Sequence, residues 1–434
     1  MAWTKAIRLL LPLVLAALLA GPALAAPQAV VIGVPTSLSL VEGRESLMAV
    51  ELAVAEINAA GGVRVGGRRL PLKVEAVDLR GASPGVTAEQ AVGVFRRFLA
   101  RPELNALVVG PFRSEVLLES MELIARRRIP LLGSIAMTPV SEALVLREPR
   151  NRFVFRVGLN TRYLTDYLIS SMRFLERRFG FKRVYILNQD VAWARTTASM
   201  MLRLYFRRAG WQVLGQRTFA STASDFAPAL EDARAKHAQA LLCIFDSPRA
   251  AGLAKQWRRL KVPALLCGFI SPIVGPDAWQ AFSGQIAGSL NVIFELGNLP
   301  SARYAPAAAF YRAFSARYGA PVQAGHGPAP SYEAVYILAQ AIERAGGLDP
   351  EALVKALEAT DRRGCMGRIR FHRGHQAFFG DDPAREALAA VIQWTPAGKR
   401  RIVFPPAIAE GDVELPAFVP RPNQSVTILP KARQ

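Results

Sequence analysis

The sequence contains few of the residue patterns on which enzyme active sites and metal sites are built. It has three cysteines and four histidines in 434 residues. It has no Gly-x-Ser-x-Gly motif, no phosphate-binding loop and no cysteine spacing typical of zinc. His372 and His375 form a His-x-x-His pair, but no third ligand stands near them in the sequence. We therefore expect a protein that is not an enzyme, with no catalytic residue, no metal and no cofactor.

Long apolar runs are scarce as well. The run at residues 9–20 follows Lys5 and Arg8 and precedes Ala-Leu-Ala at 23–25, which is the pattern of a secretory signal peptide spanning residues 1–25. No later stretch reaches about 18 uninterrupted apolar residues, so we expect no transmembrane helix in the mature chain. No cysteine stands at the cleavage site, which argues against a lipoprotein. The sequence therefore predicts export to the periplasm.

Acidic residues are outnumbered, with 34 Asp and Glu against 54 Lys and Arg and a formal net charge of +20. Such a charge would favour nucleic-acid binding in a cytosolic protein, but export argues against that partner. The arginines cluster near expected helix ends, at residues 126–128, 177–178, 207–208 and 258–259. The helix dipole favours cations there, so we interpret these clusters as solvated helix ends.

The odd number of cysteines leaves at least one unpaired in an oxidising compartment. Cys243 and Cys267 both fall in expected buried strands. Packing as small apolar side chains is favoured over a disulfide bridge for these two.

The chain repeats one pattern of short apolar strands and amphipathic helices, first over residues 30–132 and again over 184–266. Each series closes alike, with Arg-Arg-Ile-Pro-Leu-Leu-Gly at 127–133 and Leu-Lys-Val-Pro-Ala-Leu-Leu-Cys-Gly at 260–268. Alternating strands and helices predict parallel sheets with right-handed crossovers. We therefore predict an α/β fold of two doubly wound lobes, with a ligand cleft between the carboxyl ends of their strands.

The predicted domain boundaries follow from this repeat. Lobe I is expected to comprise residues 26–153 and 295–365, and lobe II residues 154–290 and 366–398. Three chain crossings, near 153–159, 288–294 and 366–371, form the expected hinge. Residues 399–434 are rich in proline and are expected to wrap the surface as a C-terminal extension.

Six segments, in order and spacing, resemble the type I periplasmic binding proteins that serve ABC importers of branched-chain amino acids and amides. They are AVAEINAAGG at 53–62, VGPFRS at 109–114, FVFR at 153–156, SDF at 224–226, SYEAV at 331–335 and AIERAGG at 341–347. The resemblance covers roughly residues 31–394. It implies a two-lobed binding protein that closes over a small molecule.

The first lobe offers a candidate cradle for a carboxylate. Ser114 stands where a strand gives way to a helix, and the first amides of a helix point toward anions. Alternatively, Ser114 only caps that helix. Phe112, in the same turn, is also expected to contact the ligand. The loop SIAMT at 134–138 resembles the family's S-P-A-A-T loop, which implies ligand contacts from Ala136 and Thr138.

The second lobe is expected to close over the ligand. Trp193 stands where the family has an aromatic lid, although the residue type alone is also compatible with a core position. The family's amino-acid binders carry an acid near the position of Ile270, and this chain has none there. A buried ammonium without a counter-charge is costly. Either Asp246 replaces that acid, or the ligand has no ammonium group.

Glu42 marks a second departure from the family, because it stands where an aromatic contact can occur. It is expected either to meet a cation in the site or to face solvent.

The resemblance implies a monomeric periplasmic receptor that captures a small amino-acid-like or carboxylate ligand and delivers it to an ABC transporter permease. Two alternatives stay open: a sensory receptor of the same fold that reports to a signalling partner, and a binder of a metabolite other than an amino acid.

Overall fold

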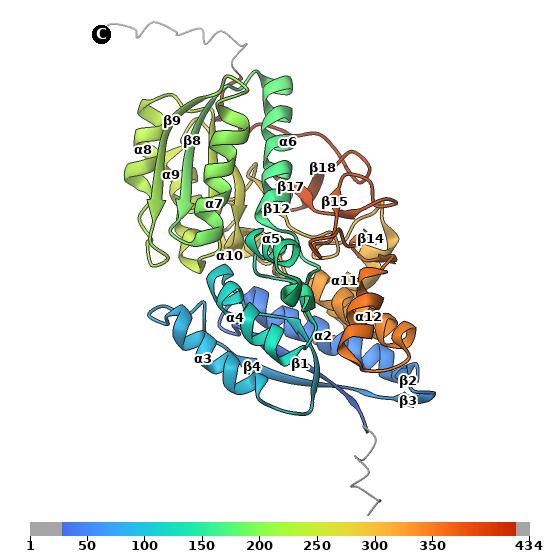
Figure 1. Cartoon of the computed structure of the whole chain (residues 1–434). Helices are drawn as coiled ribbons and strands as arrows, with labels where there is room; N and C mark the ends of the chain where they lie inside the picture. The colour runs from blue at the N-terminus through green and yellow to red at the C-terminus, as the bar shows by residue number, and fades with distance from the viewer. Residues whose placement is uncertain (1–27, 422–434) are drawn as a thin grey trace, which may run out of the picture.

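The computed structural model describes residues 28–421 and divides them into two α/β lobes (Figure 1). The predicted signal peptide, residues 1–25, and the end of the C-terminal extension, residues 422–434, lie outside the described residues. The predicted fold class is confirmed, with one sheet in each lobe and helices packed against both.

The sheet of the first lobe is entirely parallel, and its central strands are buried on both faces, as their runs of Val, Ile and Leu predict. Its strands in sheet order are β4 (Leu72–Asp78), β1 (Val30–Thr36), β5 (Leu104–Val109), β6 (Leu131–Gly133) and β7 (Val154–Arg156). The first-lobe helices are α2 (Val41–Ala59), α3 (Ala88–Leu99), α4 (Ser114–Arg127), α5 (Val140–Arg147), α11 (Ala305–Tyr318), α12 (Pro328–Ala345) and α13 (Pro350–Glu358).

The sheet of the second lobe has five parallel strands followed by two antiparallel ones at its edge. Its order is β9 (Gln212–Phe219), β8 (Arg183–Gln189), β10 (Ala240–Phe245), β11 (Leu265–Ile270), β12 (Leu290–Ile293), β17 (Ala390–Trp394) and β18 (Arg400–Phe404). The second-lobe helices are α6 (Thr161–Phe179), α7 (Ala192–Met200), α8 (Ala227–Ala235), α9 (Ala251–Leu260) and α10 (Ala278–Ala281).

Smaller elements complete the described chain. They are the hairpin β2 (Val63–Val65) and β3 (Arg68–Leu70), a small sheet of β13 (Arg362–Gly364), β14 (Gly367–Ile369), β16 (Ala387–Leu388) and β15 (Phe379–Gly380), and the short helices η1 (Pro149–Phe153), η2 (Met201–Phe206), η3 (Pro248–Ala250) and η4 (Ser271–Ile273).

Two local features differ from the pattern expected from the sequence. The second series, expected to end at residue 266, closes with β11, which begins only at Leu265, because Lys261 ends α9 in the left-handed region (φ 45°) and the chain turns before the strand. Helix α7 stops at Met200 and continues as the π-helical η2. The later strand brings Ile270 to the carboxyl end of β11, next to the cleft.

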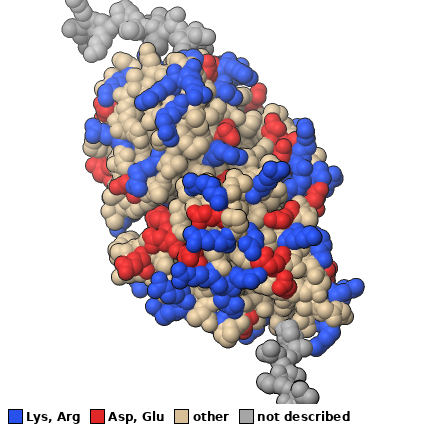
Figure 2. Space-filling view, viewed as in Figure 1, with Lys and Arg blue, Asp and Glu red and all other residues tan. Residues whose placement is uncertain are grey.

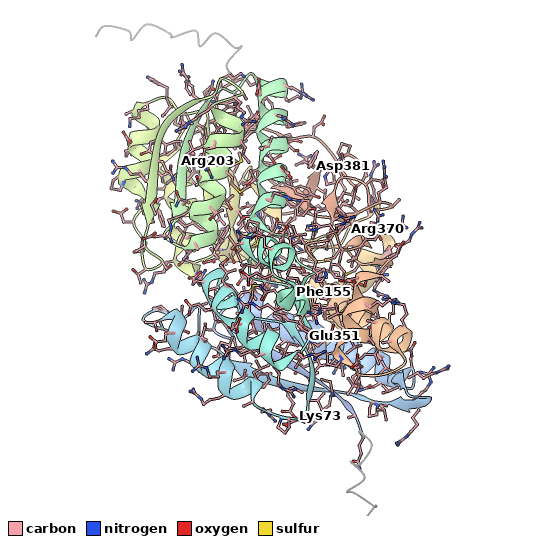
Figure 3. The ribbon with its side chains drawn as sticks, in the orientation of Figure 1. Lys73, Phe155, Arg203, Glu351, Arg370 and Asp381 are labelled. Carbon is pink, nitrogen blue, oxygen red and sulfur yellow. The ribbon has the colours of Figure 1, made fainter. Side chains whose placement is uncertain are left out.

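The segments that pass between the lobes pack against one another. Phe155 in β7 lies between the two lobes (Figure 3), and its ring stacks on His375 with 4.0 Å between centroids. Glu295, just after β12, accepts a hydrogen bond from the backbone N–H of Leu159 (3.0 Å), which follows β7. These contacts tie the connections together, so bending at one connection is coupled to the others.

The C-terminal segment is part of the second lobe up to the last described residues. Residues 400–404 form the edge strand β18 instead of a loose extension. Beyond it, the Gln393 side chain accepts a hydrogen bond from the backbone N–H of Glu414 (2.9 Å) and donates one to the backbone carbonyl of Glu414 (2.6 Å). Phe418 then packs edge-on against the buried Trp257 of α9, with 5.1 Å between ring centroids.

The cysteines and the arginine clusters take the positions expected from the sequence. All three cysteines are free and buried. The last turns of α4, α6 and α9 carry the pairs at 126–127, 177–178 and 258–259. Figure 2 shows Lys and Arg spread over the visible face of both lobes, with Asp and Glu among them. In the described part of the chain, no helix combines the length and the apolar character needed to cross a bilayer.

Glu45 in α2 makes the stability of the first lobe depend on pH. Its carboxylate accepts hydrogen bonds from the backbone N–H groups of Gln323 and Ala324, and burial raises its pKa from 4.5 to about 7. A raised folded-state pKa stabilises the protein below pH 4.5, and this contribution is lost as the pH rises through 7. Glu45→Gln keeps an acceptor without the charge, so at pH 8 it should increase the free energy of unfolding by up to about 3 kcal/mol.

Urea denaturation at pH 5 and pH 8 measures this effect. Glu51→Gln, on an exposed position of the same helix, is the matched control and should change neither value. An equal gain from both variants at pH 8 would show that the net charge, and not the burial of Glu45, is responsible.

Candidate functional site

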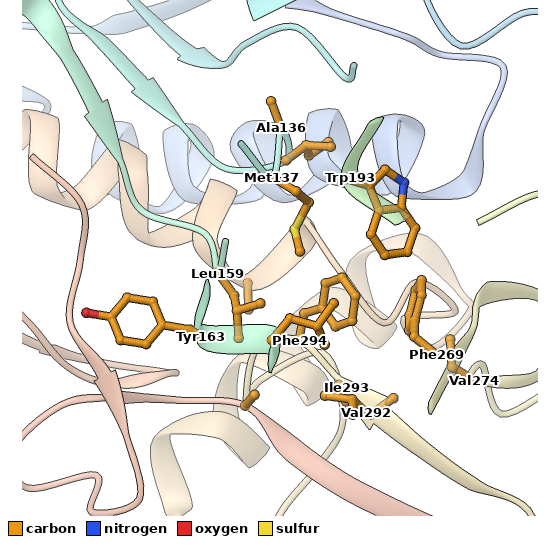
Figure 4. Close-up of a cluster of buried hydrophobic side chains, with 14 of the residues drawn as sticks. Ala136, Met137, Leu159, Tyr163, Trp193, Phe269, Val274, Val292, Ile293 and Phe294 are labelled. Carbon is orange, nitrogen blue, oxygen red and sulfur yellow. The ribbon is translucent and has the colours of Figure 1, made fainter. Parts of the chain in front are cut away.

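A small cavity lies between the lobes, at the carboxyl ends of their strands. Its apolar walls are Phe112, Ile135, Met137, Trp193, Phe269 and Phe294. Figure 4 shows Met137, Trp193, Phe269 and Phe294 converging on one region. The cavity measures about 20 Å³, roughly the room for one water molecule, so the two lobes are in a closed arrangement.

Three ionisable side chains complete the walls: Glu42 in the first turn of α2, Asp246 directly after β10, and His326 in the loop before α12. Each is buried, and each is paired. The cavity therefore combines an aromatic lining with a few polar groups, as ligand sites commonly do.

A buried ion pair joins the two lobes. Nη1 of Arg113 donates to Oδ2 of Asp246 over 2.6 Å, and Nη2 donates to Oδ1 over 3.4 Å. Both side chains are at most 9 % exposed. Burial alone would lower the pKa of Arg113, but Asp246 beside it holds that pKa above its ordinary value. Arg113 precedes α4, and the turn that presents it is strained, because the β-branched Val109 has a φ of 68°.

Second-lobe donors hold Asp246 in place independently of Arg113. Gln189, at the end of β8, donates from Nε2 to Oδ1 of Asp246 (2.8 Å). The side-chain oxygen Oε1 of Gln189 accepts from the backbone N–H of Asp246 (3.0 Å). The indole Nε1 of Trp193 donates to Oδ2 (2.8 Å). Neighbouring parallel strands β8 and β10 end side by side, which is why these residues meet. Trp193 is buried and also lines the cavity.

Glu42 makes a second contact across the cleft. It shares a short hydrogen bond with the hydroxyl of Ser271, at the start of η4 in the second lobe. Burial raises the pKa of Glu42, although the Ser271 hydrogen bond opposes that shift. The carboxyl group lies inside the cleft, away from solvent.

His326 links the cavity to the connection between the lobes. Its Nε2 lies 2.7 Å from the carbonyl oxygen of Ile135, and its Nδ1 lies 2.9 Å from Oε1 of Glu295. An imidazolium that donates from both ring nitrogens fits these two acceptors. Burial alone would lower the pKa of His326, but the Glu295 carboxylate raises it above 6.5 overall.

Ser114, Ala136 and Thr138, the residues proposed as a carboxylate cradle, do not line the cavity, although Phe112, Ile135 and Met137 close to them in the sequence do. Arg113 is the N-cap residue of α4 and Ser114 its first residue; the buried hydroxyl of Ser114 has no hydrogen-bond partner within residues 28–421. Ser114 therefore does not cap the helix here. Ala136 is buried between the cavity-lining Ile135 and Met137. Thr138 follows them, and its hydroxyl accepts a hydrogen bond from the backbone N–H of Val140 (3.1 Å).

Several residues of the site were not anticipated from the sequence. Arg113 belongs to the segment VGPFRS at 109–114 that resembles the family, but nothing in the neighbouring sequence indicated that it pairs with Asp246, 133 residues away. His326 and Phe294 lie in connecting segments, where no sequence pattern indicated that they line the cavity. Ile270 lies at the end of β11, fully buried, and supplies no carboxylate. Within residues 28–421, no three His, Cys, Asp or Glu side chains are grouped to hold a metal ion.

The fold and the cleft define a two-lobed binding protein, and comparisons with known proteins agree. The family model described as periplasmic binding protein matches residues 31–387. The chain belongs to the periplasmic binding protein family, whose members are extracytoplasmic substrate-binding proteins and not enzymes.

A curated relative and several solved structures are similar to this chain over most of its length. The Leu/Ile/Val-binding protein homolog 7 of Brucella suis is 23% identical over 386 residues, covering 86% of this chain and 90% of its own. A putative branched-chain amino acid ABC transporter protein from Silicibacter pomeroyi has a TM-score of 0.76 at 18% identity, covering 90% of this chain and 100% of its own.

Two further structures of the same fold carry ligands. LivJ of Streptococcus pneumoniae, in complex with isoleucine, has a TM-score of 0.69 at 19% identity, covering 87% of this chain and 100% of its own. A solute-binding protein of R. palustris, in complex with benzoate, has a TM-score of 0.68 at 16% identity, covering 90% of this chain and 99% of its own.

Because Glu295 raises the pKa of His326, the imidazole of His326 should stay protonated at pH values above 6.5, its ordinary pKa. The stability that this pair contributes is present below pH 6.5 and is lost as the pH rises through the folded-state pKa. Nitrogen-detected NMR titration of the imidazole rings measures it, and His326→Gln assigns the signal by removing it. A signal titrating at or below 6.5 would contradict the doubly donating geometry.

Proposed function

We propose that this chain is the periplasmic substrate-binding protein of an ABC importer and captures a small amino-acid-like or carboxylate ligand between its lobes. The position of the cavity carries this proposal. It lies where the carboxyl ends of two parallel sheets face each other, and both lobes contribute its walls. Family membership agrees with such a role.

The ligand is proposed to bind first to the open first lobe. The unpartnered hydroxyl of Ser114 and the first amides of α4 offer hydrogen bonds to a carboxylate without requiring a cation. The backbone around Ala136 and the Thr138 hydroxyl are proposed to add further contacts to the ligand. Phe112 supplies an apolar wall.

Hinge closure is then proposed to bring Trp193 and Asp246 over the ligand, while Glu42 approaches Ser271 from the opposite lobe. The closed monomer docks on the membrane permease. A dissociation constant near 1 µM corresponds to about −8 kcal/mol, which a few charge-assisted hydrogen bonds and an aromatic cover can supply.

The ligands of the compared proteins support this class. Isoleucine and benzoate, each bound by a protein of the same fold, both combine a carboxylate with a compact apolar body. The cavity here pairs aromatic walls with hydrogen-bond donors, which suits molecules of that kind.

A thermal-shift screen of the mature protein against amino acids, amides and short carboxylic acids tests the proposal. A ligand that binds only the folded protein raises the melting temperature by mass action, and at least one small carboxylate should do so. No stabilisation by any compound of these classes would contradict the proposed function.

Ser114→Ala should then weaken binding of the stabilising compound by roughly 10- to 100-fold, because it removes one hydrogen bond to a charged group. Ser120→Ala is the matched control. Its hydroxyl is also buried and without a partner in the described chain, but it lies about 9 Å further along α4. Equal losses in both variants would place the effect in the packing of α4 and not in ligand contact.

A further inference from the structure

The carboxylates around the cavity are already committed to other groups. Oδ1 of Asp246 accepts from Gln189, Oδ2 accepts from Trp193, and Arg113 donates to both oxygens. Asp246 therefore has no free position for a further cation, although its charge is near the cavity.

The other two acids are no better placed. Glu295 accepts from His326 and from the backbone N–H groups of Leu159 (3.0 Å) and Gly327 (3.2 Å). Glu42 accepts a hydrogen bond from the hydroxyl of Ser271 in the other lobe, so this carboxyl is also engaged. An ammonium group placed in this cavity would thus be buried among aromatic rings without an available counter-charge, which is energetically costly.

Arg113, by contrast, has N–H donors that its contacts with Asp246 do not use. Arg113 carries five N–H groups, and within residues 28–421 its side chain makes one strong and one long hydrogen bond, both to Asp246. It adjoins Ser114, whose hydroxyl has no partner in the same residues. A guanidinium group with free N–H donors beside a free hydroxyl matches the fork of a carboxylate.

We infer that the ligand is a small apolar monocarboxylate without an ammonium group, and that Arg113 is the side chain that selects it. This inference rests on the proposed function and narrows its ligand class. The ligand carboxylate binds Arg113 and Ser114, and its apolar body lies among Phe112, Trp193 and Phe294.

The surroundings of Arg113 allow this exchange. Gln189 and Trp193 belong to the same lobe as Asp246, so they keep Asp246 hydrogen-bonded when Arg113 turns toward the ligand. A molecule of seven or more heavy atoms needs more than about 20 Å³, so Arg113 and the flexible Met137 must shift to admit it. Arg113 then bridges the ligand in one lobe and Asp246 in the other, which couples binding to closure.

Matched pairs of ligands test the inference by isothermal titration at pH 7. Leucine is compared with 4-methylpentanoate, and phenylalanine with 3-phenylpropanoate; within each pair the acid lacks only the ammonium group. We expect each acid to bind at least 10-fold more tightly than its amino acid. Tighter binding of the amino acids would overturn the inference and leave the proposed function standing. Binding of no member of either pair would also overturn the inference, whereas the proposed function fails only if no compound of the thermal-shift screen stabilises the protein.

The role of Arg113 is tested in the variant Arg113→Met/Asp246→Asn, which removes both charges and leaves no buried ion unpaired. Affinity for the acids should fall at least 30-fold, and the preference for acid over amino acid should disappear. A merely structural ion pair would change both members of each pair equally, so a preserved preference would contradict the assignment.

If the double variant does not melt cooperatively, Arg113→Lys takes its place. It keeps the charge and removes the planar fork. Affinity for the acids should then fall about 10-fold, with part of the preference retained; unchanged affinity would contradict direct carboxylate binding by Arg113.

Discussion

Charge buried between the two lobes must be neutralised, and most of the site follows from that constraint. Arg113 and Asp246 meet across the cleft where little solvent reaches either side chain. An unpaired ion buried there would cost several kcal/mol, so the closed arrangement requires both partners. Gln189 and Trp193 complete the coordination of Asp246 from its own lobe. Closure therefore brings the Arg113 guanidinium to the Asp246 carboxylate, which its own lobe already holds by hydrogen bonds.

The same constraint explains how the connections between the lobes relate to the cavity. The His326 imidazolium needs the Glu295 carboxylate, and Glu295 also holds the backbone of Leu159 after β7. His326 reaches the cavity wall while Glu295 belongs to a connection. One pair of buried charges therefore joins the cavity wall to a connection between the lobes.

The parts of this protein that could be predicted from its sequence are those governed by local patterns. Buried strands and amphipathic helices repeat with regular spacing, so the two α/β lobes and the arginine-rich helix ends were predicted correctly. Local exceptions were missed where backbone geometry intervened, as at Lys261, whose left-handed conformation delays β11, and at η2, where the helix after α7 becomes π-helical.

The sequence by itself determined the family, the fold class, the burial of Cys243 and Cys267, and the neighbourhood of Glu42, Phe112, Trp193 and Asp246. Only the tertiary structure decided which charges face each other. Arg113 and Asp246 are far apart along the chain and belong to separate sheets, and neither residue type reveals its partner. Pairing depends on how two separately folded lobes come together. Local periodicity carries no information about how the lobes meet. The pairing of Arg113 with Asp246 reflects the electrostatic cost of burying either charge alone.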